Sequence, residues 1–276
     1  MAMYTTLIDV EGLRSLVDPV IVDCRFSLAD TARGEADYAK AHIPGAVYAH
    51  LDRDLSGPPT TDHGRHPLPP PERLSEVFSA LGIAPGAQVV AYDDANGMIA
   101  ARLWWMLRYM GHDAVAVLDG GWQAWCRAGC ATEGGIRAPN PARFAGRARR
   151  ERLRTLADLD PAHECLVDAR DPARFRGEVE PIDKRAGHIP GARNHAFQRN
   201  LAPDGRFLAP GPLRDALADS LGTLPGSTTV HYCGSGVSAC HNILAQVHAG
   251  LPEPRLYCGS WSEWSRDPQR PAAIGD

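Results

Sequence analysis

The sequence predicts an α/β protein of two tandem domains, each a parallel-stranded sheet with helices on both faces. Short apolar runs alternate with amphipathic helical stretches, as in Gln88–Tyr92, Ala100–Tyr109 and Ala114–Leu118. Such alternation is typical of a parallel sheet that is covered by helices. In addition, motifs of the first half return in the second half in the same order, which indicates two copies of one fold.

The two halves share four motifs. The pairs are Val22-Asp23 with Val167-Asp168, His42–Ala46 with His188–Ala192, Leu81-Gly82 with Leu221-Gly222, and Gly120–Trp125 with Gly259–Trp264. A chain of 276 residues is long enough for two domains of ordinary size. Residues 133–150 are rich in Gly, Pro, Ala and Arg and poor in large apolar side chains, which is typical of a linker. We therefore expect domains over residues 1–132 and 151–276.

Composition narrows the class of partner and the compartment. Hydrophobic content of 44% with 22% charged residues is that of a soluble globular protein. The net charge is −4 and the one basic cluster, Arg147–Arg150, lies in the linker, so we expect no nucleic-acid partner. Met1–Thr6 lacks a signal pattern and no apolar run reaches membrane-spanning length, so we expect no membrane partner. Seven cysteines without framework spacing favour a reducing, cytoplasmic location.

A cysteine follows a well-defined strand of the second half. The run Thr228–Tyr232 is β-branched and aromatic, follows the turn Pro225–Ser227, and leads through Cys233–Ser238 into a helical pattern over Ala239–Ala249. Ligands of open parallel sheets bind at the carboxyl ends of the strands. Backbone amides at a helix N-terminus stabilise a thiolate, and glycines let the backbone curl around the sulfur. The spacing therefore predicts Cys233 as a nucleophile.

The first half supplies an internal control. When the copies are aligned on Tyr92 and Tyr232, Asp93 stands where the second copy has Cys233, so we expect the first domain to be a scaffold.

The other cysteines are interpreted as packing or loop residues, because cysteine is among the most buried residue types. They are Cys24, Cys126, Cys130, Cys165, Cys240 and Cys258. Cys126 and Cys130 form a Cys-x3-Cys pair, but no second pair of ligands follows at zinc-site spacing, so we expect no metal.

These motifs resemble the rhodanese superfamily in its tandem-domain form, which includes the thiosulfate and 3-mercaptopyruvate sulfurtransferases. The resemblance is carried by the two His-Ile-Pro-Gly-Ala motifs, the two Gly-x-Trp-x-x-Trp endings and the loop Cys233–Ala239, and it extends from Val22 to Trp264. It implies two rhodanese-like domains, of which the second is catalytic. It also implies an enzyme that needs no cofactor and no metal.

The resemblance implies sulfur transfer through a covalent intermediate. The thiolate of Cys233 attacks the outer sulfur of 3-mercaptopyruvate or thiosulfate and displaces pyruvate or sulfite. The loop amides cradle the resulting persulfide, which passes its sulfur to cyanide, a thiol or reduced thioredoxin. The cradling residues are Gly234, Ser235, Gly236, Val237 and Ser238.

Four residues receive roles from the resemblance. Ser235 relays a proton together with Asp52 and His66, and Arg174 binds the anionic donor. A planar guanidinium suits a carboxylate or a sulfonate. From the residues alone, Asp52 and His66 are interpreted as loop residues and Arg174 as a solvated surface arginine. Both interpretations stay open at this point.

The chain departs from the family pattern at two positions. Mercaptopyruvate enzymes carry a second arginine in a Glu-Pro-Arg context, where this chain has Ile182, with Lys184 and Arg185 as candidate replacements. Cys258 stands where relatives usually have aspartate before Gly-Ser-Trp. Thiosulfate-preferring members of the family tend to carry basic residues directly after the cysteine, whereas Gly234 and Ser235 are neutral. The loop thus resembles that of the mercaptopyruvate enzymes, which implies 3-mercaptopyruvate as the donor, and a thiosulfate-preferring rhodanese is the alternative.

A phosphatase and a non-catalytic interaction module are two further functions that a fold of this kind can have. A cysteine-dependent phosphatase needs Cys-x5-Arg, in which the arginine binds the phosphoryl oxygens. Here that position is Ala239, and no arginine follows until Arg255, so a phosphatase is disfavoured. A non-catalytic interaction module of the rhodanese type remains an alternative to the enzyme.

Overall fold

The computed structural model describes residues 3–58, 60, 63–223, 226 and 228–276. The chain forms two compact units. Unit 1 comprises Met1–Gly57, Pro69–Arg149 and Asp204–Arg206, and unit 2 comprises Pro58–Leu68, Arg150–Pro203 and Phe207–Asp276. No helix among the described residues combines the length and the apolar character that crossing a membrane requires.

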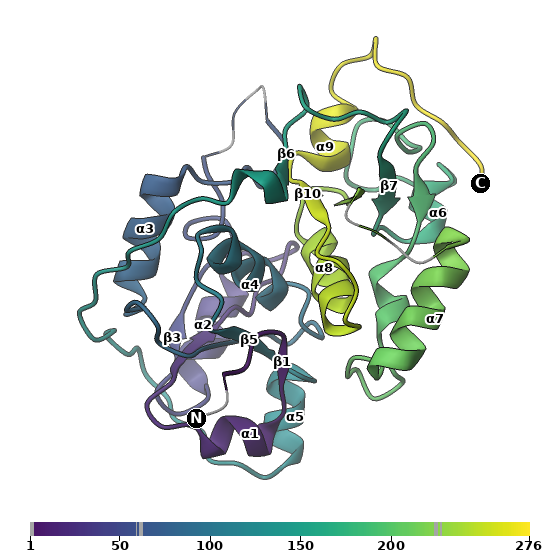
Figure 1. Cartoon of the computed structure of the whole chain (residues 1–276). Helices are drawn as coiled ribbons and strands as arrows, with labels where there is room; N and C mark the ends of the chain where they lie inside the picture. The colour runs from purple at the N-terminus through teal and green to yellow at the C-terminus, as the bar shows by residue number, and fades with distance from the viewer. Residues whose placement is uncertain (1–2, 59, 61–62, 224–225, 227) are drawn as a thin grey trace. The chain divides into compact units, whose positions relative to one another are not determined.

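Unit 1 contains a five-stranded parallel sheet with the strand order β1-β5-β4-β2-β3. Its strands are β1 (Leu7–Ile8), β2 (Val20–Asp23), β3 (Val47–Tyr48), β4 (Val89–Tyr92) and β5 (Val115–Leu118). Its helices are α1 (Val10–Ser15), α2 (Arg33–Lys40), α3 (Pro71–Ala80), α4 (Ala100–Tyr109) and α5 (Gly121–Arg127). The strand, helix and strand predicted between residues 88 and 118 are present (Figure 1).

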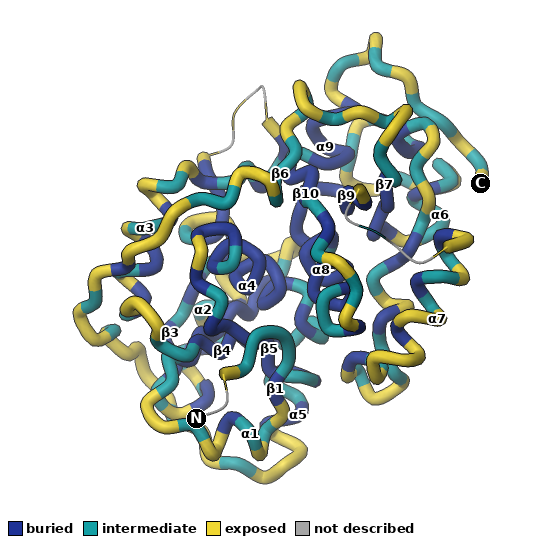
Figure 2. The backbone as a smooth tube through the Cα atoms, viewed as in Figure 1, coloured by how far each residue is buried: buried dark blue, intermediate teal, exposed yellow. Residues whose placement is uncertain are grey.

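Helices cover both faces of this sheet. One apolar cluster joins strand residues such as Ile21 and Val90 to Leu13 of α1, Tyr38 of α2 and Trp125 of α5. Alternate strand residues point to the opposite face, and there α4 contacts β4 and β5. Figure 2 shows α4 as an almost continuously buried helix. The α/β class predicted for the first half is confirmed.

Unit 2 repeats this architecture with the strand order β6-β10-β9-β7-β8, again with all pairs parallel. Its strands are β6 (Leu153–Arg154), β7 (Cys165–Asp168), β8 (Arg193–Asn194), β9 (Thr229–Tyr232) and β10 (Arg255–Tyr257). Its α-helices are α6 (Pro172–Phe175), α7 (Pro210–Leu221), α8 (Ser238–His248) and α9 (Ser260–Trp264), and its short 3₁₀ helices are η1 (Arg150–Arg152) and η2 (Phe197–Asn200). The predicted strand and helix on either side of Cys233 are therefore present as β9 and α8. Two residues of the predicted turn, Pro225 and Ser227, lie outside the described residues.

The repeat extends to side-chain contacts. Arg25 and Arg170 each pair with the aspartate two residues earlier, Asp23 and Asp168, at 2.6 and 2.7 Å. Each guanidinium also lies over a tryptophan ring of its own unit, at 4.5 Å in unit 1 and 5.0 Å in unit 2. Because the same contact occurs in the copy without a thiol, we assign it to the stability of the fold.

Two short segments are exchanged between the halves of the chain. Residues 58–68 belong to unit 2 although they come from the first half, and residues 204–206 belong to unit 1. The predicted linker packs on unit 1, where the ring of Phe144 lies 5.0 Å from that of Phe78. The domain bounds expected from the sequence, residues 1–132 and 151–276, stay a prediction. They do not account for the two exchanged segments.

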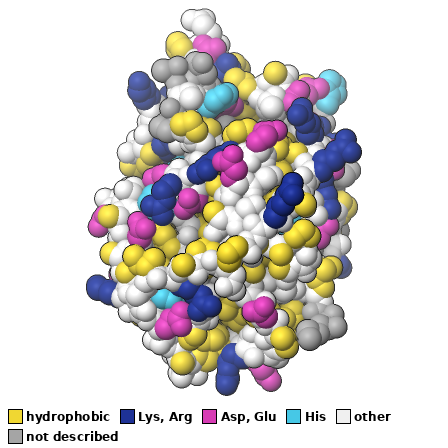
Figure 3. All heavy atoms as spheres, turned by 90° about the vertical axis from the view of Figure 1, so that its left-hand side faces the viewer, with side chains coloured by type: hydrophobic (Ala, Val, Ile, Leu, Met, Phe, Trp, Pro, Cys, Tyr) yellow, Lys and Arg dark blue, Asp and Glu magenta, His cyan; other side chains and the backbone are white. Residues whose placement is uncertain are grey.

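Charged side chains are mixed on the surface. On the face drawn in Figure 3, basic and acidic side chains are interspersed rather than gathered into a stripe. Many of the arginines are paired with carboxylates, as Arg33 is with Asp37 at 3.1 Å.

Candidate active site

The candidate site is built on the loop that joins β9 to α8. Strand β9 lies between β10 and β7, so Cys233 follows an interior strand of the sheet. The Sγ atom of Cys233 accepts a hydrogen bond from the backbone N–H of Gly236 at 3.1 Å. Cys233 is only 1% exposed, which shields its sulfur from bulk water. The thiol thus lies beside a loop amide just before helix α8, where the sequence predicted it.

The loop conformation depends on Gly236. Its φ of 78° lies in the left-handed region, and a Cβ atom at this position would lie 2.4 Å from the carbonyl oxygen of Cys258. A side chain is excluded on both grounds. Cys258, at the unusual position noted above, donates its thiol to the carbonyl oxygen of His66 at 3.8 Å.

Helix α9 holds the same loop from the other side. The backbone N–H groups of Trp261 and Ser262 donate to the carbonyl oxygens of Cys233 and Gly234, both at 2.9 Å. The N–H of Cys233 donates to the hydroxyl of Ser260 at 3.1 Å. The second Gly-x-Trp-x-x-Trp ending therefore provides the support of the cysteine loop, as well as packing.

His66 and Ser235 lie together, as predicted. The Nδ1 atom of His66 is 2.7 Å from the hydroxyl oxygen of Ser235, and both residues are buried in unit 2. This contact exists because residues 63–68, which come from the first half of the chain, pack in unit 2. Asp52 belongs to unit 1, where it is an exposed residue after β3. Its membership of a proton relay stays a prediction.

Arg174 is not the solvated surface residue of the alternative interpretation. Its guanidinium donates to Glu180 at 2.6 Å and to Asp183 at 3.3 Å, and its side chain is 17% exposed. Burial alone would raise the pKa of Glu180, but hydrogen bonds from Arg174 and from the amides of Asp183 and Ile182 lower it below its usual value. The charge of Arg174 is thus held in a fixed position.

Sequence reasoning missed a second arginine, Arg65. Its Nη1 forms an ion pair with Asp183, and its backbone N–H donates to the hydroxyl of Ser262 at 3.0 Å. A Cβ atom at Gly234 would lie 2.8 Å from Nη2 of Arg65. The one sequence signal was its place directly before His66, a residue already assigned to the site.

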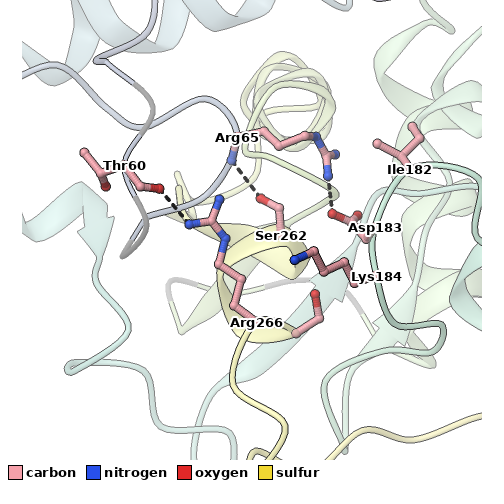
Figure 4. A pocket seen from close by; sticks show the side chains of 8 residues that line it. Thr60, Arg65, Ile182, Asp183, Lys184, Ser262 and Arg266 are labelled. Carbon is pink, nitrogen blue, oxygen red and sulfur yellow. Dashed lines mark hydrogen bonds and ion pairs between the residues drawn. The ribbon is translucent and has the colours of Figure 1, made fainter.

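A cavity of about 640 Å³ adjoins this group of residues (Figure 4). Its lining residues are Thr60, Arg65, Ile182, Asp183, Lys184, Ser262, Ser265 and Arg266. Of the two candidate replacements for the missing arginine, Lys184 lines this cavity. Arg185 instead donates to the carbonyl oxygen of Arg270 at 2.7 Å. Burial raises the pKa of Asp183, the carboxyl group of the lining, above its usual value.

The histidine, cysteine, aspartate and glutamate side chains give no metal site in the described part of the chain. Within residues 3–58, 60, 63–223, 226 and 228–276, no group of three or more of them could hold a metal ion. The chemistry available at the site is that of a thiol, a hydroxyl–imidazole pair and two guanidinium groups.

Comparison with known protein families identifies the two halves of the chain as copies of one domain. A rhodanese-like domain matches residues 9–128 and again residues 150–267. The chain belongs to the rhodanese-like family. The resemblance inferred from the sequence is thereby confirmed.

Individual relatives of this rhodanese-like chain carry the names of sulfurtransferases. It is 49% identical over 265 residues to the "Probable 3-mercaptopyruvate sulfurtransferase" of Pseudomonas aeruginosa, with 94% of this chain and 93% of that protein covered. It is 33% identical over 255 residues to the thiosulfate sulfurtransferase of Rattus norvegicus, with 89% and 84% covered. The solved 3-mercaptopyruvate sulfurtransferase from Leishmania major superimposes with a TM-score of 0.86 at 35% identity, over 95% of this chain and 74% of that one.

Proposed function

We propose that this rhodanese-like protein is a sulfurtransferase that carries sulfur on Cys233 as a persulfide. The observation that carries the proposal is the position of the Cys233 sulfur, hydrogen-bonded to the amide of Gly236 with the His66–Ser235 pair in the same loop region. The names of the relatives support sulfur transfer as the reaction class.

The first half-reaction loads the cysteine. With 3-mercaptopyruvate, the thiolate of Cys233 bonds to the donor sulfur, and the carbon–sulfur bond breaks with its electron pair going to carbon. The proton of the donor thiol ends on that carbon, so the products are a persulfide and pyruvate. With thiosulfate, the sulfur–sulfur bond breaks and sulfite leaves with the electron pair. Neither route needs an external oxidant or reductant, and both are nucleophilic displacements by an activated thiol.

The second half-reaction transfers the sulfur from the Cys233 persulfide to an acceptor. An acceptor nucleophile bonds to the outer sulfur and the thiolate of Cys233 leaves. Cyanide, a small thiol and reduced thioredoxin are the acceptors that we propose, and in each case the acceptor takes the sulfur while the enzyme returns to its starting state. The amides of residues 234–238, which include the N–H of Gly236, would stabilise the negative charge of the persulfide between the two half-reactions.

Protonation of the pyruvate carbon requires a proton carrier. Ser235 and His66 form such a pair at 2.7 Å, and we propose that the hydroxyl of Ser235 delivers the proton while His66 receives or returns it. Asp52 is proposed as the third member, from the family pattern alone. Arg174 is proposed to bind the anionic end of the donor, since its guanidinium is fixed beside the loop.

We also propose a reducing compartment such as the cytoplasm. All seven cysteines are free thiols, and a protein with seven thiols and no disulfide is typical of reducing compartments.

The test is a direct assay with both donors. Purified protein is incubated with 3-mercaptopyruvate or with thiosulfate, cyanide is added, and thiocyanate is measured. We expect thiocyanate from at least one donor and a loss to background in Cys233→Ser. Mass spectrometry should find one extra sulfur atom on the peptide that contains Cys233 after exposure to donor alone. Equal thiocyanate from the wild type and Cys233→Ser would contradict the proposal.

A further inference from the structure

Two guanidinium groups converge on one side of the cysteine loop. A Cβ atom built on Gly234, the residue after Cys233, would lie 2.8 Å from Nη2 of Arg65. It would also lie 3.7 Å from both Nη1 and Nη2 of Arg174. Because Gly234 has no side chain, guanidinium nitrogens from two distant segments of the chain come close to the backbone of the cysteine loop.

A buried carboxylate fixes the two arginines relative to each other. Asp183 pairs with Nη1 of Arg65 through one oxygen and with Nη2 of Arg174 at 3.3 Å through the other. The side chain of Asp183 is 6% exposed. Glu180 adds two further contacts to Arg174, at 2.6 and 3.3 Å. The geometry of the arginine pair is thus set by residues of the same unit.

Part of each guanidinium is still available for another ligand. In the described part of the chain, no hydrogen bond engages Nη2 of Arg65 or Nη1 of Arg174, and Nε of Arg65 is buried without a partner. Nη2 of Arg65 and Nη1 of Arg174 are two of the nitrogens that lie close to Gly234, directly after Cys233. Charge-assisted hydrogen bonds from arginine to a small oxyanion are among the strong ones in proteins.

The arrangement also accounts for the departure of the sequence at Ile182. That side chain lines the cavity shown in Figure 4, together with Arg65 and Asp183. The cation that the family pattern would supply from position 182 is absent there, and Arg65 supplies one from a segment more than a hundred positions earlier. A planar, permanently charged guanidinium can serve in either place, because its role is set by geometry and not by chain position.

We infer that Arg65 is the second donor-binding cation, and that Arg65 and Arg174 together hold the oxyanion end of the donor over Gly234 while Asp183 positions both. This inference rests on the proposed sulfur transfer. The ligand chemistry is a small molecule with a carboxylate or sulfonate-type group next to a transferable sulfur. Arg65 is thus a residue for donor recognition, and the acceptor step does not use it.

The first experiment measures steady-state kinetics of Arg65→Met with each donor separately. We expect the KM for 3-mercaptopyruvate, for thiosulfate or for both to rise about tenfold or more, the loss typical of a charge-assisted hydrogen bond. The KM for cyanide should stay unchanged. The donor whose KM rises identifies which oxyanion the pair binds. Arg266→Met is the matched control, because Arg266 lines the same cavity but donates to the carbonyl oxygen of Thr60.

Arg65→Lys protects the test against misfolding. Lysine keeps a positive charge beside Asp183 but lacks the fork of two terminal nitrogens, so the donor KM of this variant should lie between those of the wild type and Arg65→Met.

A second experiment measures binding without catalysis. Pyruvate and sulfite are each titrated by calorimetry into Cys233→Ser, with and without the additional substitution Arg65→Met. We expect the second substitution to weaken binding of at least one of them about tenfold or more.

The outcomes separate the two claims. An active wild-type protein whose KM for both donors is unaffected by Arg65→Met and Arg65→Lys overturns the inference and leaves the proposed function standing. A wild-type protein that loads no sulfur onto Cys233 from either donor overturns the proposed function itself. In that case the calorimetric titrations still decide whether Arg65 binds a small oxyanion.

Discussion

At the scale of single residues, the contact between His66 and Ser235 has a consequence that differs between donors. The displacement of pyruvate leaves a carbon that must gain a proton, whereas sulfite leaves without needing one. If the His66–Ser235 pair carries the proton as proposed, its 2.7 Å contact should matter for 3-mercaptopyruvate and not for thiosulfate.

We predict that Ser235→Ala slows transfer from 3-mercaptopyruvate by about a hundredfold, the usual contribution of a positioned proton donor. Transfer from thiosulfate should change by less than about threefold, because no proton is delivered in that half-reaction. The measurement is kcat for each donor with cyanide as a common acceptor, so thiosulfate serves as the internal control. An equal loss with both donors would contradict the proton-delivery role and would instead show that the Ser235 hydroxyl contributes to a step that both donors share.

At the scale of secondary-structure elements, the cysteine loop is held between β9 and α8 and supported by α9. The next contact along this framework joins β9 to α8, where Nε2 of His231 lies 3.0 Å from the side-chain oxygen of Gln246. Burial lowers the pKa of His231 to about 4, and burial likewise lowers the pKa of His195 to about 4. Both histidines are therefore neutral in the folded protein at neutral pH.

This burial predicts a pH dependence of stability. A histidine takes up a proton near pH 6.5 when unfolded and only near pH 4 in the folded state, so the unfolded state binds more protons in between. The contribution that each neutral buried histidine makes to stability should be fully present above about pH 6.5. The free energy of unfolding should then fall by about 2 kcal/mol per buried histidine on going to pH 5.

We expect His231→Gln to reduce that loss by about 2 kcal/mol, measured by urea unfolding at pH 7 and pH 5. His163→Gln is the control, since the side chain of His163 is 82% exposed. A wild-type and a His231→Gln protein with the same difference between the two pH values would contradict the assignment.

At the scale of the whole molecule, the two units share one sheet order and differ at the end of the matching strand. Asp93 follows β4 as Cys233 follows β9. Its carboxylate accepts four backbone hydrogen bonds, from Ala95 and Gly97 at one oxygen and from Ile99 and Ala100 at the other, at 2.7–2.9 Å. The amide cradle of unit 1 is thus occupied by the protein's own carboxylate.

We predict that Asp93→Asn destabilises the protein by about 2–4 kcal/mol, because the amide nitrogen would face two N–H donors and leave them unsatisfied. The readout is the urea midpoint, with Asp94→Asn as the control. Asp94 pairs at 3.4 Å with Arg33, whose side chain is 57% exposed, so its loss should cost less than about 1 kcal/mol. Similar midpoints for the two variants would show that the four hydrogen bonds contribute little.

The sequence predicted what depends on local pattern. Strand β9, helix α8 and the position of Cys233 between them follow from side-chain periodicity and glycine spacing, and these were correct to within one or two residues. The pairing of His66 with Ser235 came from family resemblance, since neither residue has a local signal. Arg65 could not be found in this way, because its place above Gly234 depends on where segment 58–68 packs. Tertiary packing of distant segments leaves no trace in periodicity.

The exchange of segment 58–68 limits how this enzyme could be shortened. A gene fragment that starts at residue 150 would encode the nucleophile, its strand and its helix, but it would omit the histidine and the arginine that border the cysteine loop. Here the first half of the chain encodes residues that lie beside the proposed site in the second half, which gives a physical reason for the two halves to be inherited as one polypeptide.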